Sequence, residues 1–180
     1  MARHALISFG RMACAVTVFC AISLAVSAAS ASGPTERLGL NGTFMLSVGK
    51  SGKCLAKANG ANMGQQMHAW SCRDGASAQK FKLLERERGW YLMLTATGRM
   101  CLDVSGSAVK NGAPVVQWGC QGGANQLWQV LPDGGSNRFQ LRARHSGRCL
   151  HLDKIGGQIS TFVQRDCKRG EPAQTFFVTK

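Results

Sequence analysis

The stretch CLDVSGSAVKNGAPVVQWGCQGGANQLW, residues 101–128, contains the pattern on which the rest of the chain is built. It holds two cysteines and ends in a Gln-x-Trp triplet, and the same order of elements occurs once before it and once after it. The first cysteines lie 47 and 48 residues apart, the second cysteines 48 and 47, and the glutamines 47 and 48. Three markers that share one period indicate a threefold internal repeat. The markers are Cys54, Cys72 and Gln79, then Cys101, Cys120 and Gln126, then Cys149, Cys167 and Gln174.

Residues 1–31 have the properties of a secretory signal peptide. A basic start precedes an apolar run from Met12 to Ala25, and Ala29-Ser30-Ala31 is a small-residue cleavage site. The apolar run is shorter than the ~20 residues that a membrane-spanning helix needs. We therefore expect cleavage, a short linker over residues 32–41 and a single domain over residues 42–180. The mature protein is expected outside the cell or in the periplasm, with no membrane span.

Six cysteines remain after this cleavage, two in each repeat. In an exported protein, an even number of regularly spaced cysteines indicates a disulfide framework. The threefold repeat favours one pairing of the 15 that six cysteines allow, namely Cys54–Cys72, Cys101–Cys120 and Cys149–Cys167. Each bond would close a loop of roughly 18 residues and contribute about 3 kcal/mol in the chain-entropy model. No metal or other cofactor is expected, because C-x-x-C pairs are missing and the histidines have no ligand spacing.

Alternating apolar residues precede the first cysteine of each repeat, which is typical of half-buried strands. The three sets are Phe44, Leu46 and Val48, then Trp90, Leu92 and Leu94, then Phe139, Leu141 and Ala143. A turn of the type Ser/Thr-Gly-basic follows each set, and Met100 counts as one extra residue in the middle copy. In the third copy, Gln140, Arg142 and Arg144 are expected to face outward.

The apolar period of 3.6 residues that marks a long helix is missing, so we predict an all-β domain. Each copy alone has too little core to be stable, and closing three copies around a pseudo-threefold axis would also protect the sheet edges. The repeats are expected at about 42–88, 89–136 and 137–180. The aromatic residue of each Gln-x-aromatic triplet is expected in the core.

Without the first 31 residues the chain has 20 basic and 9 acidic residues, a net charge of +11. The third repeat is the most basic part, with nine Lys or Arg against three acids from Arg138 to Lys180. This charge suits an acidic partner such as a polyanion, and it equally suits a solvated, solubilising face. The candidate polyanion contacts are Arg142, Arg144, Arg165, Lys168 and Arg169.

Three copies of Cys-Leu … Cys … Gln-x-(Trp/Phe) resemble the ricin-B-type β-trefoil lectins, which are also described as Q-x-W repeat carbohydrate-binding modules. The resemblance covers about Gly42 to Lys180. It implies a twelve-strand β-trefoil, one disulfide per repeat and up to three shallow sugar sites.

By this resemblance, the middle repeat carries a sugar site made of Asp103, Trp118 and Asn125, with Gln126 bracing it. The chemistry suits a sugar. A carboxylate accepts strong hydrogen bonds from neighbouring hydroxyls, an indole face packs on the apolar side of a pyranose ring, and an amide both donates and accepts.

The other two repeats depart from this pattern. In the first repeat the acid and amide positions hold Ala56 and Ala78, and only Trp70 remains as a possible secondary stacking surface. In the third repeat the three positions hold His151, Arg165 and Ala173. We therefore expect one main site, in the middle repeat.

These features predict a secreted carbohydrate-binding protein that recognises glycans, with galactose-type units as the first candidates. The alternative is a non-catalytic protein- or polyanion-binding trefoil, such as a toxin accessory subunit, that uses the basic third repeat. An enzyme is not expected. Glycoside hydrolysis usually needs two carboxylates at the scissile bond, and the motif of the middle repeat has no second acid near Asp103.

Overall fold

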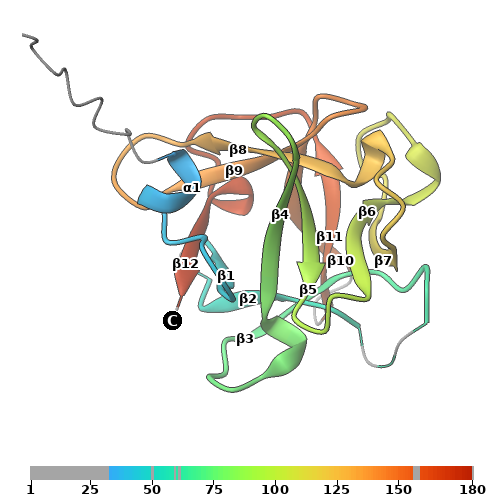
Figure 1. Cartoon of the computed structure of the whole chain (residues 1–180), viewed down its shortest axis with the longest axis horizontal. Helices are drawn as coiled ribbons and strands as arrows, with labels where there is room; N and C mark the ends of the chain where they lie inside the picture. Colours follow the sequence, from blue (N-terminus) through green and yellow to red (C-terminus); the bar gives the residue numbers. More distant parts are fainter. Residues whose placement is uncertain (1–32, 50, 59, 61, 156–158, 180) are drawn as a thin grey trace, which may run out of the picture. The chain divides into compact units, whose positions relative to one another are not determined.

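The computed structural model describes residues 33–179 except 50, 59, 61 and 156–158. The predicted signal peptide lies outside the described residues. The described residues form twelve strands, four in each repeat (Figure 1). The first repeat contains β1 (Met45–Val48), β2 (Lys53–Ala56), β3 (His68–Ser71) and β4 (Phe81–Glu87). The second contains β5 (Trp90–Thr95), β6 (Met100–Val104), β7 (Val115–Gly119) and β8 (Leu127–Pro132). The third contains β9 (Phe139–Ala143), β10 (Cys149–Ile155), β11 (Ile159–Arg165) and β12 (Phe176–Thr179).

Short helical turns complete the repeats. A 3-10 turn precedes the last strand of each repeat: η1 (Ser77–Gln79), η3 (Ala124–Gln126) and η4 (Pro172–Gln174). A further turn, η2 (Ser105–Ser107), follows β6. The α-helix α1 (Pro34–Arg37) precedes β1 and contacts β8 (Figure 1). Within the predicted linker 32–41, Leu40 is buried in the main core, so packing begins before Gly42.

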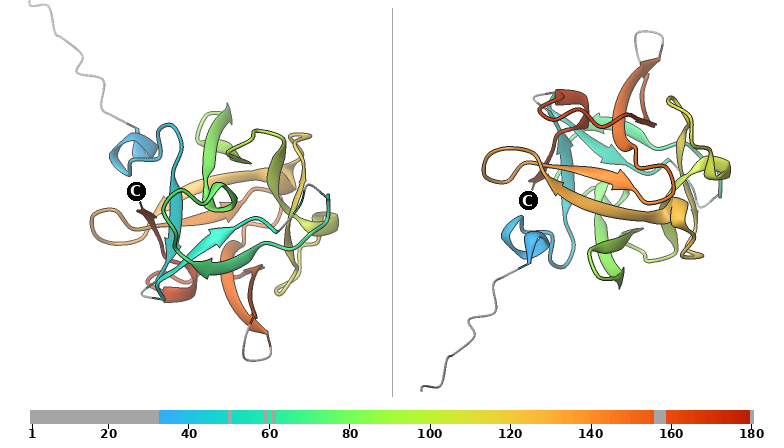
Figure 2. Two further views of the ribbon diagram at one scale, coloured as in Figure 1. Left: turned by 90° about the horizontal axis from the view of Figure 1, so that it is seen from below. Right: turned by 90° about the horizontal axis from the view of Figure 1, so that it is seen from above.

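The first and last strands of the repeats form a closed six-stranded barrel. Antiparallel pairing runs from β1 through β12, β9, β8 and β5 to β4. The ring closes because Phe44 and Phe81 exchange two backbone hydrogen bonds, of 3.0 and 2.8 Å. The other strands form the hairpins β2–β3, β6–β7 and β10–β11, and β10–β11 extends away from the body of the domain (Figure 2). The predicted all-β fold, a β-trefoil, is confirmed.

The barrel surrounds one main hydrophobic core to which all three repeats contribute. The aromatic residues of the Gln-x-aromatic triplets, Phe81, Trp128 and Phe176, are almost fully buried in it, as predicted. Trp128 also donates its indole N–H to the carbonyl of Leu102 at 3.0 Å, which satisfies the one polar group of that side chain. The repeat thus delivers one large apolar side chain per copy to the same core.

The three predicted disulfides are confirmed. Cys54–Cys72, Cys101–Cys120 and Cys149–Cys167 have Cα–Cα distances of 5.0, 5.1 and 5.0 Å. Each one ties the start of a hairpin to the turn that follows that hairpin. The bonds therefore hold together the segments on which the site positions lie.

The predicted alternation of β5 is wrong by one residue. Leu94 pairs with Cys101, as Ser47 pairs with Cys54 and Arg142 with Cys149, so Leu94 occupies an outward position. The main core receives Met93 instead. The sets predicted for β1 and β9 do lie in that core.

The error has a physical cause. Strand β5 is apolar on both faces, because Trp90, Leu92 and Leu94 pack in a second, small cluster with Cys101 and Leu127. Alternation alone cannot tell the two faces apart, and a shift of one residue exchanges them. Met100 is therefore not an extra residue; the predicted set was displaced by one.

Truncating two neighbours on β5 tests this register. Met93→Ala should lower the free energy of unfolding by about 2 to 5 kcal/mol, since it opens a cavity in the main core. Leu94→Ala should cost about 1 kcal/mol, because Leu94 is only partly buried in the small cluster. Urea unfolding of the two oxidised variants measures the difference. A larger loss for Leu94→Ala would contradict the register.

Candidate functional site

The glutamine of the middle triplet holds the backbone on both sides of Cys120. Gln126 Nε2 donates to the carbonyl of Gly119 at 2.8 Å. Its Oε1 accepts from the backbone N–H groups of Gln121 and Gly122 at 2.8 and 3.0 Å. The side chain is almost fully buried, so these bonds satisfy an amide that would otherwise be costly to bury.

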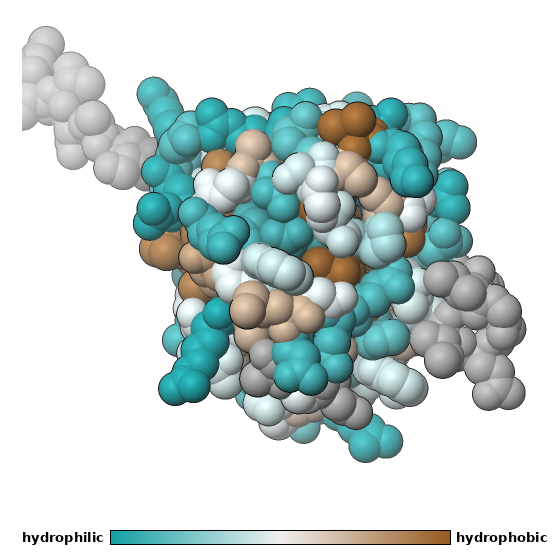
Figure 3. All heavy atoms as spheres, turned by 90° about the vertical axis from the view of Figure 1, so that its right-hand side faces the viewer, coloured by the Kyte–Doolittle hydropathy of each residue, from teal (hydrophilic) through white to brown (hydrophobic). Residues whose placement is uncertain are grey.

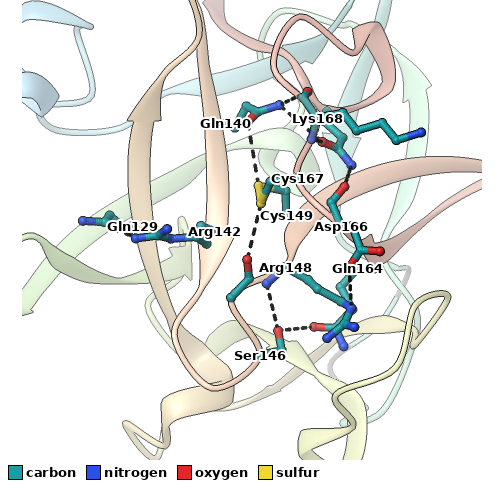
Figure 4. The surroundings of a disulfide bond; sticks show 12 residues. Gln129, Gln140, Arg142, Ser146, Arg148, Cys149, Gln164, Asp166, Cys167 and Lys168 are labelled. Atoms are coloured by element: carbon teal, nitrogen blue, oxygen red, sulfur yellow. Dashed lines mark hydrogen bonds and ion pairs between the residues drawn. A yellow bond between two sulfur atoms is a disulfide. The ribbon is translucent and has the colours of Figure 1, made fainter.

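The glutamines of the other two triplets do the same around Cys72 and Cys167. The partners are Ser71 O and Arg73 N–H for Gln79, and Asp166 O and Lys168 N–H for Gln174, at 2.8 to 2.9 Å. Figure 4 shows Asp166 and Lys168, which flank Cys167 in the chain, beside the Cys149–Cys167 bond. Because every repeat has this brace, it belongs to the fold rather than to one site.

The three residues predicted to contact sugar in the middle repeat lie together. Asp103 comes from β6, Trp118 from β7 and Asn125 from η3, and all three line one surface hollow of about 310 Å³. Gln126 lies behind Asp103 and reaches its carboxylate from the buried side.

Asp103 is 5% exposed, and two amides orient its carboxylate. Its Oδ2 accepts from Gln126 Nε2 at 2.8 Å and from Asn125 Nδ2 at 3.0 Å. Burial raises the pKa of this carboxyl group above that of an ordinary aspartate, while the bonds from Gln126 and Asn125 and the nearby His145 act in the opposite direction. Two hydrogen bonds therefore orient the carboxylate, while burial removes part of its hydration.

Trp118 is 37% exposed, and a loop of the first repeat lies against its ring edge. A Cβ added to Gly64 would lie 3.4 Å from Cζ3 of Trp118, and Gly64 has a φ of +81°. Gln117 fastens this loop, because its Nε2 donates to the carbonyl of Asn62 at 2.8 Å and to Gln65 Oε1 at 3.1 Å. The first repeat therefore supports the edge of the Trp118 ring, although the residues that line the hollow all belong to the middle repeat.

Sequence reasoning missed four residues that also line this hollow: Ser105, Gly106, Ser107 and Gln121. The Ser-Gly-Ser turn directly after Asp103-Val104 was a usable signal, because Gly106 has a φ of +60° and bends the chain around the carboxylate. The approach of Gly64 to Trp118 has no local signal, since it is a contact between repeats.

The described residues of the third repeat do not bring the same set of side chains together. Arg165, at the position of Trp118, donates to Asp153 Oδ2 at 2.8 Å. His151, at the position of Asp103, is partly buried, and burial lowers the pKa of its imidazole, which favours the neutral ring. Arg165 is thus engaged within the repeat, and His151 supplies no carboxylate at the acid position.

Several cations of the third repeat are also engaged within the domain. Arg142 donates to Gln129 Oε1 (Figure 4), and Arg144 pairs with Glu87 and lies over the ring of Trp90 at 5.6 Å. The expectation that Gln140 faces outward is wrong. Its side chain is buried and donates to the carbonyl of Lys168 at 2.7 Å.

The side of the domain where β6 and β7 lie in Figure 1 is shown as a surface in Figure 3, where hydrophobic residues form small separate groups on a hydrophilic background. In the described ranges, no helix is long and apolar enough to cross a membrane. Those residues also contain no cluster of three or more His, Cys, Asp or Glu side chains with the geometry of a metal site.

Comparison with known proteins agrees with this geometry. The designed 3-fold symmetric protein ThreeFoil has a TM-score of 0.70 at 26% identity, over 78% of this chain and 99% of that chain. The Polyporus squamosus lectin, solved bound to a human-type influenza-binding epitope, has a TM-score of 0.65 at 17% identity, over 78% of this chain and 49% of that chain. The latter likeness shows the fold alone.

Sequence comparison gives a partial relative and a family. The probable lipoprotein EnvE of Salmonella typhimurium is 33% identical over 58 residues, which cover 32% of this chain and 30% of that protein. A family model described as the ricin-type beta-trefoil lectin domain matches residues 42–176, most of the chain. With its twelve strands, three equivalent disulfides and three Gln-x-aromatic triplets, the chain belongs to the ricin-type β-trefoil lectin domain family.

Proposed function

We propose that the protein binds glycans by holding one sugar unit in the hollow of the middle repeat. The observation that carries this proposal is the meeting of Asp103, Trp118 and Asn125 in one hollow, while each of the other repeats lacks the acid and the amide. A fold that needed these side chains for stability would need them in all three repeats. Their presence in one repeat supports a role in binding.

The atoms available in the hollow fit a sugar ring. Both amide donors reach Oδ2 of Asp103, so Oδ1 is the oxygen that can accept from sugar hydroxyls. Asn125 uses its Nδ2 on Asp103 and on the carbonyl of Val104, so its Oδ1 is the atom that can accept a further hydroxyl. The exposed face of Trp118 offers an apolar surface for the C–H side of a pyranose.

The same lining favours binding without reaction. Among the described residues that line the hollow, Asp103 is the only acid. Hydrolysis of a glycosidic bond usually needs a second carboxylate across the bond. A single shallow site commonly gives millimolar affinity, about −4 kcal/mol, so strong retention would need a repetitive glycan.

The proposed location is outside the cytoplasm. Three disulfides favour an oxidising compartment, and the signal-peptide pattern of residues 1–31 predicts export. The partial relative EnvE is named a probable lipoprotein, which supports an extracellular or envelope location.

Replacing the carboxylate tests the site. Asp103→Asn keeps the shape of the side chain and an oxygen for Gln126, but it removes the charge, so retention on immobilised galactose-type and other neutral glycans should fall about tenfold or more. A glycan array with the oxidised protein measures this. Asp74→Asn, which changes an exposed acid at the first-repeat turn, is the matched control and should bind normally. Unchanged retention in Asp103→Asn would rule out the assignment.

The raised pKa of Asp103 predicts opposite effects of pH on binding and on stability. Binding needs the carboxylate, so retention should fall as pH drops through the raised pKa. Stability should move the other way: the folded state holds the proton more tightly than the unfolded chain, so the contribution of this group is full below the unfolded pKa and is lost as pH rises through the folded pKa.

This opposition is measured by array binding and urea unfolding from about pH 3 to about pH 7. The difference in stability between the wild type and Asp103→Asn isolates this carboxyl group from the other acids. If the stability of the wild type relative to Asp103→Asn instead rose with pH, together with binding, the pKa of Asp103 would be lowered rather than raised.

A further inference from the structure

The first repeat has its own hollow at the place that corresponds to the middle site. Its volume is about 280 Å³. Its lining includes Ala56, Trp70, Ala78 and Gln79, which are the counterparts of Asp103, Trp118, Asn125 and Gln126. The brace by Gln79 and the Cys54–Cys72 disulfide hold its walls as in the middle repeat.

This hollow keeps the aromatic wall and loses the acceptors. Trp70 is 55% exposed, more than Trp118, and its ring centroid lies 6.1 Å from that of His68. Ala56 and Ala78 leave open the space that the carboxylate and the amide fill in the middle repeat. A neutral sugar would therefore find a stacking surface but no charged acceptor for its hydroxyls.

Two cations line the same hollow. Lys57 and Arg73 form no ion pair among the described residues, and no acid is among the lining residues. The neighbouring Asp74 caps its own turn by accepting from the backbone N–H of Gly75 at 2.8 Å. Lys57 Nζ lies 3.4 and 3.3 Å from the carbonyls of Ala58 and Gly60, which leaves a third N–H of the ammonium for a ligand.

The geometry points to a second binding site in the first repeat, where cations instead of a carboxylate face the ligand. We propose that this hollow binds a sugar unit that carries a carboxylate or a sulfate. The ring packs on Trp70, and the acid is held by Arg73 with Lys57 beside it, because guanidinium and ammonium groups make charge-assisted hydrogen bonds to such anions. The inference goes beyond the proposed function and does not depend on the middle site.

The size of the site favours an acidic saccharide over a nucleic acid. One exposed indole and two cations in a hollow of about 280 Å³ match one ring with one acidic group. Nucleic acid is instead bound along a row of phosphates by many cations. The basic third repeat offers less of such a row than its composition suggests, because Arg142, Arg144 and Arg165 are engaged within the domain.

The test follows the indole N–H signals of the oxidised protein by NMR during titration with four probes: lactose, sulfated lactose, glucose and glucuronic acid. The Trp70 signal, assigned with Trp70→Phe, should shift with at least one acidic probe at concentrations where its neutral counterpart gives no shift. The affinity should fall on raising the salt concentration, since the contact is exposed and charged.

Two variants and two controls locate the contact. Arg73→Gln should weaken binding of the acidic probe about tenfold or more, and Trp70→Ala should also weaken it. Both side chains are exposed, so the variants should keep the melting temperature of the parent. Arg88→Gln removes an equal charge from an exposed position outside the hollow and should have no effect, and Asp103→Ala should leave the acidic probe bound.

Opposite results overturn the inference. These are equal responses to the acidic and neutral probes, equal losses in Arg73→Gln and Arg88→Gln, or loss of the acidic probe in Asp103→Ala. Tighter binding of a single-stranded oligonucleotide than of either acidic sugar would also overturn it. Failure of the middle site is distinguishable, since it would leave neutral sugars unbound in the wild type and the Trp70 response intact.

Discussion

The buried amide of the Gln-x-aromatic triplet connects the barrel to the hairpins in every repeat. An amide enclosed in this way must find partners for both its donor and its acceptor, and it finds them in the backbone on either side of the second cysteine. The aromatic side chain two residues later is fixed in the barrel core. The turn that carries the second half of each site therefore cannot move independently of the barrel. In the middle repeat the same amide also reaches Asp103, so the brace of the fold orients the binding group.

Contacts between repeats add a second constraint, and they run in a cycle. Gln117 of the second repeat donates to Asn62 and Gln65 of the first, and Gln164 of the third donates to the carbonyls of Ala108 and Lys110 of the second. The first repeat has Ala69 at this position, and there the backbone of β11 pairs directly with β3, Ser160 opposite Ala69. The residues that line the first and the middle hollow come from their own repeats, and contacts with a neighbouring repeat hold the hairpins that carry them.

The sequence predicted those parts of the structure that recur with the period of the chain. The disulfides and the buried aromatics follow from positions that repeat. The set Asp103, Trp118 and Asn125 was implied by the resemblance to the ricin-B-type lectins. The features that were not predicted depend on the packing of both strand faces or on contacts between repeats. Strand β5 is apolar on both faces, so alternation gave the wrong register. The approach of Gly64 to Trp118 and the pair between Arg144 and Glu87 join different repeats, and no local sequence pattern predicts such contacts.

Because the glutamine braces and the disulfides stabilise the fold, the residues at the site positions can differ between repeats. The residue two positions after the first cysteine is one that changes the charge facing a ligand. Asp103 gives the middle hollow a hydrogen-bond acceptor. In the first hollow Ala56 stands at this position, and the charged lining residues are the cations Lys57 and Arg73. In the third repeat Arg165 pairs with Asp153 instead of facing a ligand. Such a partly exposed pair adds about 0 to 1 kcal/mol to stability, so its effect is to occupy the position rather than to hold the fold. At equivalent positions the three repeats thus place a carboxylate in the middle hollow, two cations in the first and an internal ion pair in the third.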